Sequence, residues 1–304
     1  MGKHIFPLAR AINLFSRKSL FQKAFAISLC GVLGTNLTAG LLMGQNRQAS
    51  AGEPKKNLVA QTKYKPGKFR IVYGEVKSPF YRELQKELRK SKALEPIGEA
   101  LNSFELTLPT DVPIIFTECG ELNAYYNPGD QSIKICYDLL THYAELFSKN
   151  SPKGSVDKAF EEAASVLFFV VLHETGHALV DLLKIPVTGR EEDAVDSLAA
   201  IILLEGEEED SADEIVINTA RAFALQGQGQ VEGGNIPFAD EHSLDLQRFA
   251  SLACLVYGKN PNKYADIVQN GILPKSRAAR CPSEYAQARN SWIRLLERHS
   301  LSSS

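Results

Sequence analysis

The sequence has little that would attract nucleic acid or an anionic membrane surface. Its formal net charge is only -2, and residues 1–51 contain six Lys or Arg but no Asp or Glu. Removing those six from the 34 basic residues of the chain leaves 28 against 36 acidic ones, a charge of about -8 on the remainder. That remainder has no basic stripe interleaved with aromatic residues and no internal repeat. We therefore expect no nucleic-acid partner, and membrane contact only through the N-terminal segment if that segment is not cleaved.

The basic N-terminal segment is typical of an export signal. It leads into the apolar run 24–43 and then into Ala49-Ser50-Ala51, an A-x-A cleavage pattern before Gly52. Glycines and threonines make this run weak as a permanent membrane span, although an uncleaved anchor remains the alternative. A lipoprotein signal is disfavoured because Leu29 stands where a small residue should precede Cys30. In both main interpretations the body of the protein lies outside the cytoplasm, as a periplasmic or extracellular protein.

Cysteine is scarce, and four of the five cysteines remain if the signal is removed: Cys119, Cys136, Cys254 and Cys281. An even number in an exported chain favours two disulfides over four free thiols. Residues 118–138 have the pattern of a hairpin that turns at 127–130, so residues facing each other have numbers that sum to about 257. Cys119 and Cys136 fall close to that condition, which predicts a cross-strand bridge. Cys254 then pairs with Cys281 by elimination.

The pattern of apolar residues predicts one mixed domain after the N-terminal segment. A polar linker spans 52–68, the domain spans 69–298, and 299–304 is a tail. The acidic run 206–210 lacks the spacing of a calcium loop and is expected to be a solvated surface, and 226–235 is expected to be a loop. We expect strands at 69–76, 112–119 and in the 118–138 hairpin, and helices at 79–104, 137–148, about 155–184, 191–206, 240–257 and 283–298.

Three ionisable residues interrupt the apolar run VVLHETGHALVDLL at 170–183. His173 and His177 are four residues apart, so on a helix their imidazoles point to one place. The pattern His-Glu-x-x-His on a helix is the signature of zincin metalloproteases, with both His as zinc ligands and the Glu, here Glu174, as general base. Burial of these three groups without a metal would be costly. Gly176 allows a close approach of backbone to the site.

A catalytic zinc needs a third protein ligand, which the next predicted helix offers. Glu192 lies fifteen residues after His177, and Asp196 follows one turn later. This spacing resembles the gluzincin arrangement, in which the Glu binds zinc and the Asp supports a ligand imidazole. Glu191 and Asp193 are rival ligands, but neither has an acid four residues further on. A solvated acidic cluster is the remaining alternative.

Four segments together are similar to one known family. They are HETGHALVDLLKIPVTGREEDAVDSLA, ECGELNAYYNPGDQSIKICYDLL, DEHSLDLQRFASLACLVYG and LPKSRAARCPSEY. The chain resembles, over 68–298, the putative metallopeptidase family found among exported bacterial proteins. This resemblance implies an α+β, zincin-like metalloprotease domain, with a small mixed or antiparallel sheet packed on the His-Glu-x-x-His helix and a helical C-terminal half. It also implies zinc, held by His173, His177 and Glu192, with Glu174 as the catalytic residue and a peptide or protein as the substrate.

Further residues are candidates for roles beside the metal. Hydrolysis of a peptide needs a donor for the developing oxyanion, and His242 is the first candidate and Tyr126 the weaker one. Arg248 can bind a substrate carboxylate or form a structural ion pair, which we favour. The hairpin residues 123–126 can offer a sheet edge to a substrate strand. Two other functions stay open: a non-catalytic exported protein with a structural zinc site, and a zinc amidase that acts on cell-wall material.

Overall fold

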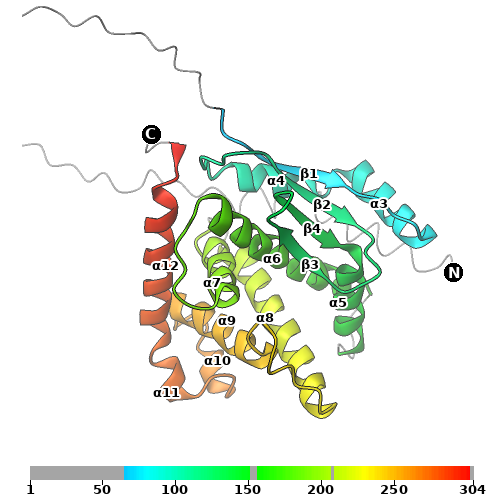
Figure 1. The fold of residues 1–304 in the computed structure, drawn as a ribbon. Coiled ribbons are helices and arrows are strands. Elements are labelled where there is room, and N and C mark those ends of the chain that lie inside the picture. Colours follow the sequence, from blue (N-terminus) through cyan, green and yellow to red (C-terminus); the bar gives the residue numbers. More distant parts are fainter. Residues whose placement is uncertain (1–64, 151–155, 207–208, 302–304) are drawn as a thin grey trace, which may run out of the picture. The chain divides into compact units, whose positions relative to one another are not determined.

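A four-stranded mixed sheet forms the N-terminal half of the domain in the computed structural model, which describes residues 65–150, 156–206 and 209–301. The strands are β1 (Phe69–Tyr73), β2 (Val112–Thr117), β3 (Ala124–Asn127) and β4 (Ser132–Cys136). Their order is β1-β2-β4-β3 (Figure 1), with β1, β2 and β4 parallel and β3 antiparallel to β4 at one edge. The short loop 128–131 between β3 and β4 is the hairpin that the sequence predicts.

One face of this sheet is buried under helices. Ile114 lies beside Ile133 and Phe116 beside Ile135, and all four side chains are fully buried. The covering helices are α3 (Pro79–Ser91), α4 (Glu95–Asn102), α5 (Tyr137–Lys149) and α6 (Val156–Leu182). Helix α6 packs against β3 and β4, which places its middle turns beside the antiparallel edge of the sheet.

Helix α6 is the central element of the domain. It is apolar around most of its circumference, as expected of a helix enclosed on all sides. Among the described residues it is also the one helix long and apolar enough to cross a membrane, but 83% of its most apolar window is buried inside the domain. A core helix meets the same criteria of length and composition, and here α5, α7 and α8 pack around it.

The C-terminal half is helical, as expected. It contains α7 (Glu191–Leu204), α8 (Glu209–Glu232), α9 (Asp245–Lys259), α10 (Asp266–Gln269), α11 (Lys275–Ala278) and α12 (Cys281–Glu297). Helix α8 packs between α6 and α9, and α12 packs along α9 and α7 (Figure 1). The described domain is therefore α+β, with the sheet and the helical layer meeting at α6.

Two of the expected elements are wrong. The single helix predicted at 79–104 is two helices, because Lys92 adopts a left-handed conformation (φ 52°) that ends α3, and Pro96 stands in the first turn of α4. The loop predicted at 226–235 is largely the last two turns of α8, a helix that the sequence analysis missed. The export signal or anchor at 1–51, the linker up to residue 64 and the side chains of the acidic run at 207–210 lie outside the described residues.

Both predicted disulfides are present, but the geometry proposed for the first is wrong. Cys119 and Cys136 are joined, with their Cα atoms 5.4 Å apart. Cys119 does not lie on the strand that faces Cys136 across the hairpin. It follows the end of β2, where Thr117 is the parallel neighbour of Cys136, so the bridge links the ends of two parallel strands. Asn123 instead faces Cys136 across the hairpin.

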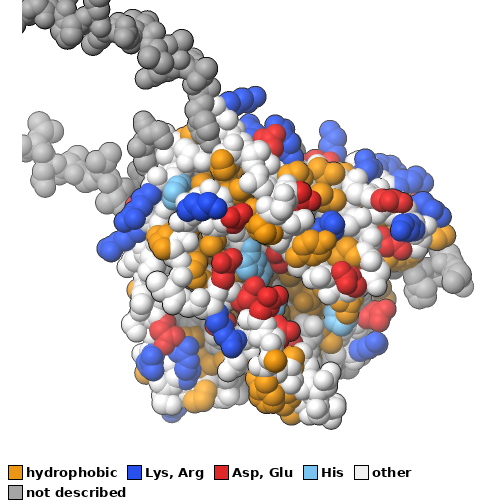
Figure 2. Space-filling model, in the orientation of Figure 1, with side chains coloured by type: hydrophobic (Ala, Val, Ile, Leu, Met, Phe, Trp, Pro, Cys, Tyr) orange, Lys and Arg blue, Asp and Glu red, His pale blue; other side chains and the backbone are white. Residues whose placement is uncertain are grey.

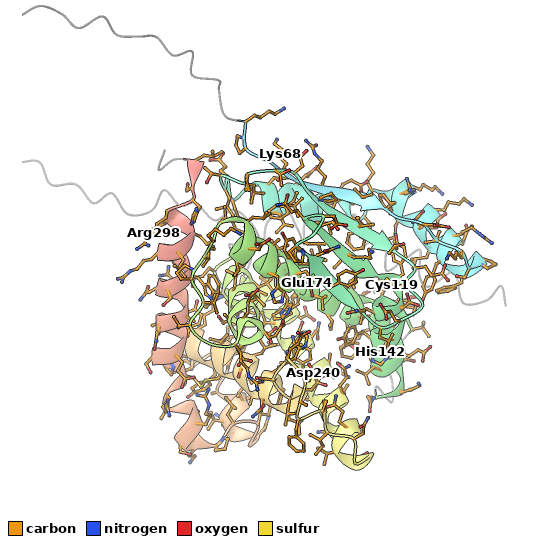
Figure 3. All side chains as sticks on the ribbon, in the orientation of Figure 1. Lys68, Cys119, His142, Glu174, Asp240 and Arg298 are labelled. Carbon is orange, nitrogen blue, oxygen red and sulfur yellow. A yellow bond between two sulfur atoms is a disulfide. The ribbon has the colours of Figure 1, made fainter. Side chains whose placement is uncertain are left out.

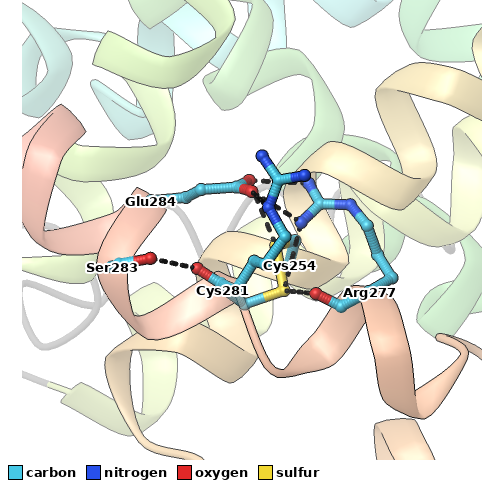
Figure 4. Close-up of a disulfide and its surroundings, with 6 residues drawn as sticks. Cys254, Arg277, Cys281, Ser283 and Glu284 are labelled. Carbon is cyan, nitrogen blue, oxygen red and sulfur yellow. Dashed lines mark hydrogen bonds and ion pairs between the residues drawn. A yellow bond between two sulfur atoms is a disulfide. The ribbon is translucent and has the colours of Figure 1, made fainter.

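The second disulfide joins α9 to the first residue of α12. Cys254 and Cys281 have Cα atoms 5.1 Å apart, and an ion pair between Arg277 and Glu284 (2.7 Å) lies beside them (Figure 4). The last described residues also contact the domain, and Thr107 donates its N–H to the His299 carbonyl. Leu301 likewise donates its N–H to the Glu105 carbonyl.

Candidate metal centre

Three predicted ligands from two helices converge at one point. His173 and His177 come from successive turns of α6, and their Nε2 atoms are 3.2 Å apart. Glu192, in the first turn of α7, places Oε2 3.0 Å from His173 Nε2 and Oε1 3.3 Å from His177 Nε2. Each residue offers a ligand atom within 4.8 Å of the other two.

These distances fit a small divalent cation. Zinc binds imidazole nitrogen and carboxylate oxygen at about 2.0–2.1 Å in tetrahedral geometry, which places ligand atoms about 3.3 Å from one another. Glu192 also has the electrostatics of a ligand. Burial alone would raise its pKa, but hydrogen bonds from three imidazoles outweigh burial and hold the pKa well below its usual range. The site thus presents a fixed negative charge between two imidazoles.

Each of these two imidazoles has a carboxylate beside its Nδ1 atom. His173 Nδ1 lies 2.7 Å from Asp196 Oδ1, and His177 Nδ1 lies 2.7 Å from Glu191 Oε1. When Nδ1–H donates to these carboxylates, the Nε2 lone pairs face the shared point, as metal ligation requires. Burial opposes the charged form of His173, but the hydrogen bonds with Asp196 and Glu192 raise its pKa to about 9.

Asp196 is itself fixed by an ion pair. Arg248, on α9, donates two hydrogen bonds to its carboxylate, at 2.7 and 2.8 Å, and the guanidinium lies 4.0 Å from the centre of the Phe223 ring. Although burial disfavours the charged form of Asp196, Arg248 and His173 lower its pKa strongly. Of the two roles considered for Arg248, the structure shows a structural ion pair. It extends the support of His173 into a third helix.

The rival acids do not face the ligand atoms. Glu191 contacts the opposite nitrogen of His177, and Asp193 accepts a hydrogen bond from the Ser243 hydroxyl at 2.6 Å. Gly176 allows the two helices to meet, because a Cβ there would lie 2.8 Å from the Cβ of Val195 on α7. The close approach expected at this glycine is thus one of helix to helix.

Glu174 lies beside the edge strand. The residue lies near the middle of the view in Figure 3 and is only 6% exposed. The main-chain N–H of Tyr126 on β3 donates to Glu174 Oε2 at 2.8 Å. Burial raises the pKa of this carboxyl above its usual range, although the neighbouring imidazoles and the Tyr126 N–H oppose the change.

The two candidate oxyanion donors have different positions. His242, in the loop between α8 and α9, has its Nε2 2.9 Å from Glu192 Oε2, and its ring lies parallel to that of His173 at 5.8 Å. Asp240 accepts hydrogen bonds from both the N–H and Nδ1 of His242, at 2.9 and 3.1 Å. The Tyr126 hydroxyl instead donates to Asp181 at 2.8 Å, so the structure brings His242 to the site and directs the Tyr126 hydroxyl elsewhere.

Part of the site reaches the surface, because the side chain of His242 is 37% exposed and those of His177 and Glu192 are 15% and 16% exposed. Figure 2 shows histidine side chains in a hollow at the centre of the face that is drawn, with Asp and Glu side chains beside them.

Three residues that contact the site were not predicted from the sequence: Glu191 as the partner of His177, Asp240 as the partner of His242, and Asp181 as the partner of Tyr126. Only Asp181 carried a spacing signal, because it follows His177 by four residues on the same helix face.

Comparison with known proteins agrees with this geometry. Residues 73–296 match the model of a family described as "Putative metallopeptidase". Neither a curated protein nor a solved structure matches the chain. The matched residues include both helices that contribute the converging side chains, the edge strand and the loop that carries His242.

Proposed function

The chain belongs to the putative metallopeptidase family, and on that premise we propose that it is an exported zinc-dependent peptidase with Glu174 as its general base. The convergence of His173, His177 and Glu192 beside Glu174 carries this proposal. The arrangement supports a zincin-like fold of the gluzincin type, in which the helix after the His-Glu-x-x-His helix supplies the third ligand. Two disulfides within the domain support an oxidising compartment outside the cytoplasm.

The two imidazoles and the Glu192 carboxylate would hold the zinc. When bound, zinc lowers the pKa of water toward about 7 and polarises a peptide carbonyl. By accepting the Nδ1–H, the carboxylates of Asp196 and Glu191 would orient each ring with Nε2 toward the metal and make that nitrogen a more basic ligand, and the Arg248 ion pair keeps Asp196 charged.

Glu174 has the position and protonation behaviour of a general base. The Tyr126 N–H holds Oε2, so Oε1 would take a proton from the attacking water and deliver it to the leaving nitrogen. Burial raises the pKa of the carboxyl, which brings it closer to the pH at which a proton can be both accepted and released. His242, oriented by Asp240, would donate from Nε2 to the developing oxyanion.

The edge strand β3 would bind the substrate backbone. Asn123 accepts a hydrogen bond from the Cys136 N–H, so alternation along the antiparallel pair turns the main-chain groups of Ala124 and Tyr126 away from β4. An extended peptide that adds to this edge would run directly past Glu174.

A purely structural zinc site is a poorer interpretation of these residues. Structural zinc is usually closed by four protein ligands and is often rich in cysteine. All four cysteines in the described part of the chain are in disulfides, and a structural site has no use for a buried carboxylate beside its first imidazole. A zinc amidase shares the same chemistry and differs only in the substrate.

Metal analysis combined with a cleavage assay tests the proposal. The purified protein and its Glu174→Gln variant should each contain one zinc, whereas only the wild type should cleave peptides in a proteome-derived library. Gln keeps the shape of Glu174 and its contact with Tyr126 but cannot accept the proton, so we expect a loss of about 100-fold or more in kcat. Equal cleavage by both proteins would exclude Glu174 as the base, and cleavage of cell-wall amides alone would favour the amidase.

A further inference from the structure

Tyr126 binds the active-site helix at two points. Its main-chain N–H donates to Glu174 Oε2 at 2.8 Å, and its hydroxyl donates to Asp181 Oδ2, also at 2.8 Å. Glu174 and Asp181 are seven residues apart on α6, so they share one face of the helix and are separated by about 10.5 Å along its axis. One residue of the edge strand, Tyr126, is therefore hydrogen-bonded to α6 at two points that lie about two helical turns apart.

Asp181 is positioned to accept the hydrogen bond from the Tyr126 hydroxyl, and we assign it no other role at the site. Lys184 Nζ lies 3.0 Å from Asp181 Oδ1, which leaves Oδ2 to accept the Tyr126 hydroxyl. These two hydrogen bonds lower the pKa of the Asp181 carboxyl and keep it charged. The acceptor for Tyr126 is thus an ionised oxygen, and such hydrogen bonds are stronger than neutral ones.

The position of Tyr126 decides where a paired substrate would lie. Because Ala124 and Tyr126 turn their main-chain groups away from β4, a substrate strand would pair with both main-chain groups of Ala124 and with the Tyr126 carbonyl. The N–H of Tyr126 already donates a hydrogen bond to the Glu174 carboxylate. The register of β3 against α6 therefore also sets which substrate bond lies beside the base, and a shift by one pair of residues would move the substrate by about 6.8 Å.

We propose that Asp181, acting through the Tyr126 hydroxyl, is a positioning residue that sets the register of β3, and of any substrate strand paired with it, relative to Glu174. The substrate part of this inference rests on the proposed peptidase function. The part that concerns Tyr126 and Glu174 is a property of the protein alone and can be tested without substrate.

Hydrogen exchange of the Tyr126 amide, followed by NMR, measures the positioning directly. Tyr126→Phe and Asp181→Ala should each make this amide exchange about tenfold faster, because Tyr126 then keeps only one of its two hydrogen bonds to α6. Asp181→Asn, which retains an acceptor oxygen, should restore slow exchange. Tyr264→Phe is the matched control, since it removes a tyrosine–aspartate bond to Asp213 in the helical half.

Cleavage-site mapping by mass spectrometry measures the consequence for a substrate. With a fixed peptide set, Tyr126→Phe should lower kcat about tenfold and add cleavage positions two residues from the main one, at unchanged zinc content. Tyr264→Phe should keep the wild-type map. Wild-type amide exchange in Tyr126→Phe, or faster exchange with an unchanged map, overturns the inference. If the wild type cleaves no peptide, the proposed function fails, and the exchange experiment alone decides the positioning role.

Discussion

Replacing Asp196 with Asn tests how the support of His173 contributes to metal affinity. The side chain of Asp196 is 11% exposed, and its carboxylate contacts His173 Nδ1 and both Arg248 donors. Asn has nearly the same shape but no charge, and only one of its two polar atoms can accept a hydrogen bond. The variant therefore removes the charge behind the imidazole while it leaves the three ligands in place.

Two effects of different size should follow. Loss of a carboxylate behind a ligand imidazole typically weakens metal binding about 10- to 100-fold, or about 1.4 to 2.7 kcal/mol. Arg248 would also lose its charged partner while remaining buried, and breaking such a pair costs about 3 kcal/mol or more. For a domain of this size, that cost should lower the Tm of the metal-free protein by roughly 6 to 12 °C.

Competition with a fluorescent chelator at pH 7.5 measures zinc affinity, and calorimetry in excess chelator measures stability. The control is Asp193→Asn, three residues earlier on α7, whose carboxylate faces Ser243 and not the ligands. It should bind zinc as tightly as the wild type. Unchanged affinity in Asp196→Asn, or an equal loss in Asp193→Asn, would refute the assignment of these two acids.

Three further predictions concern stability. Removing zinc by dialysis against a chelator should lower the Tm, since a ligand at a thousand times its Kd adds about 4 kcal/mol, and Glu192→Gln should lose most of this difference. Replacing Cys254 and Cys281 together with Ser opens a link between residues 27 apart, which should cost roughly 3.5 kcal/mol in urea unfolding; no change would show that packing alone holds α9 to α12. Burial lowers the pKa of His142 below 6.5, and its buried Nε2 has no hydrogen-bond partner among the described residues. The unfolded chain therefore protonates first, so His142 contributes stability above pH 6.5 that is lost as pH falls through its folded pKa; His142→Gln should have a flatter stability curve from pH 7.5 to 5.0, and an equally steep curve would contradict this.

The residues that converge at the site were accessible from the sequence because their spacing is local. Two imidazoles four residues apart must share a helix face, and Glu192 and Asp196 repeat that spacing on the next helix. Glu192 was preferred to Glu191 and Asp193 as the third ligand only because an acid, Asp196, lies four residues after it. The structure gives the physical reason: residues 191, 192 and 193 project about 100° apart, so only the middle one can face the two Nε2 atoms.

What the sequence did not predict depends on contacts between distant segments. Helix α8 ends in Gln and Gly residues that have the composition of a loop, yet tertiary contacts hold it helical up to Glu232. The first disulfide was assigned correctly for a wrong reason, since the hairpin rule places residues only across an antiparallel pair. Cys119 meets Cys136 through the parallel pairing of β2 with β4, which no local sequence pattern indicates.

Helix α9 contributes to the candidate metal centre although none of the three candidate ligands lies on it. Arg248 on α9 keeps Asp196 charged, and the loop before α9 carries His242 to Glu192. The far end of α9 is fixed by its disulfide and by Gly258, where a Cβ would lie 2.3 Å from the Cys281 carbonyl oxygen. Because α9 is fixed at that end, it holds the long side chain of Arg248 near its other end, with the buried guanidinium in one position. The orientation of His173 thus depends on packing between α9 and α12, and no short motif around the histidines encodes that packing.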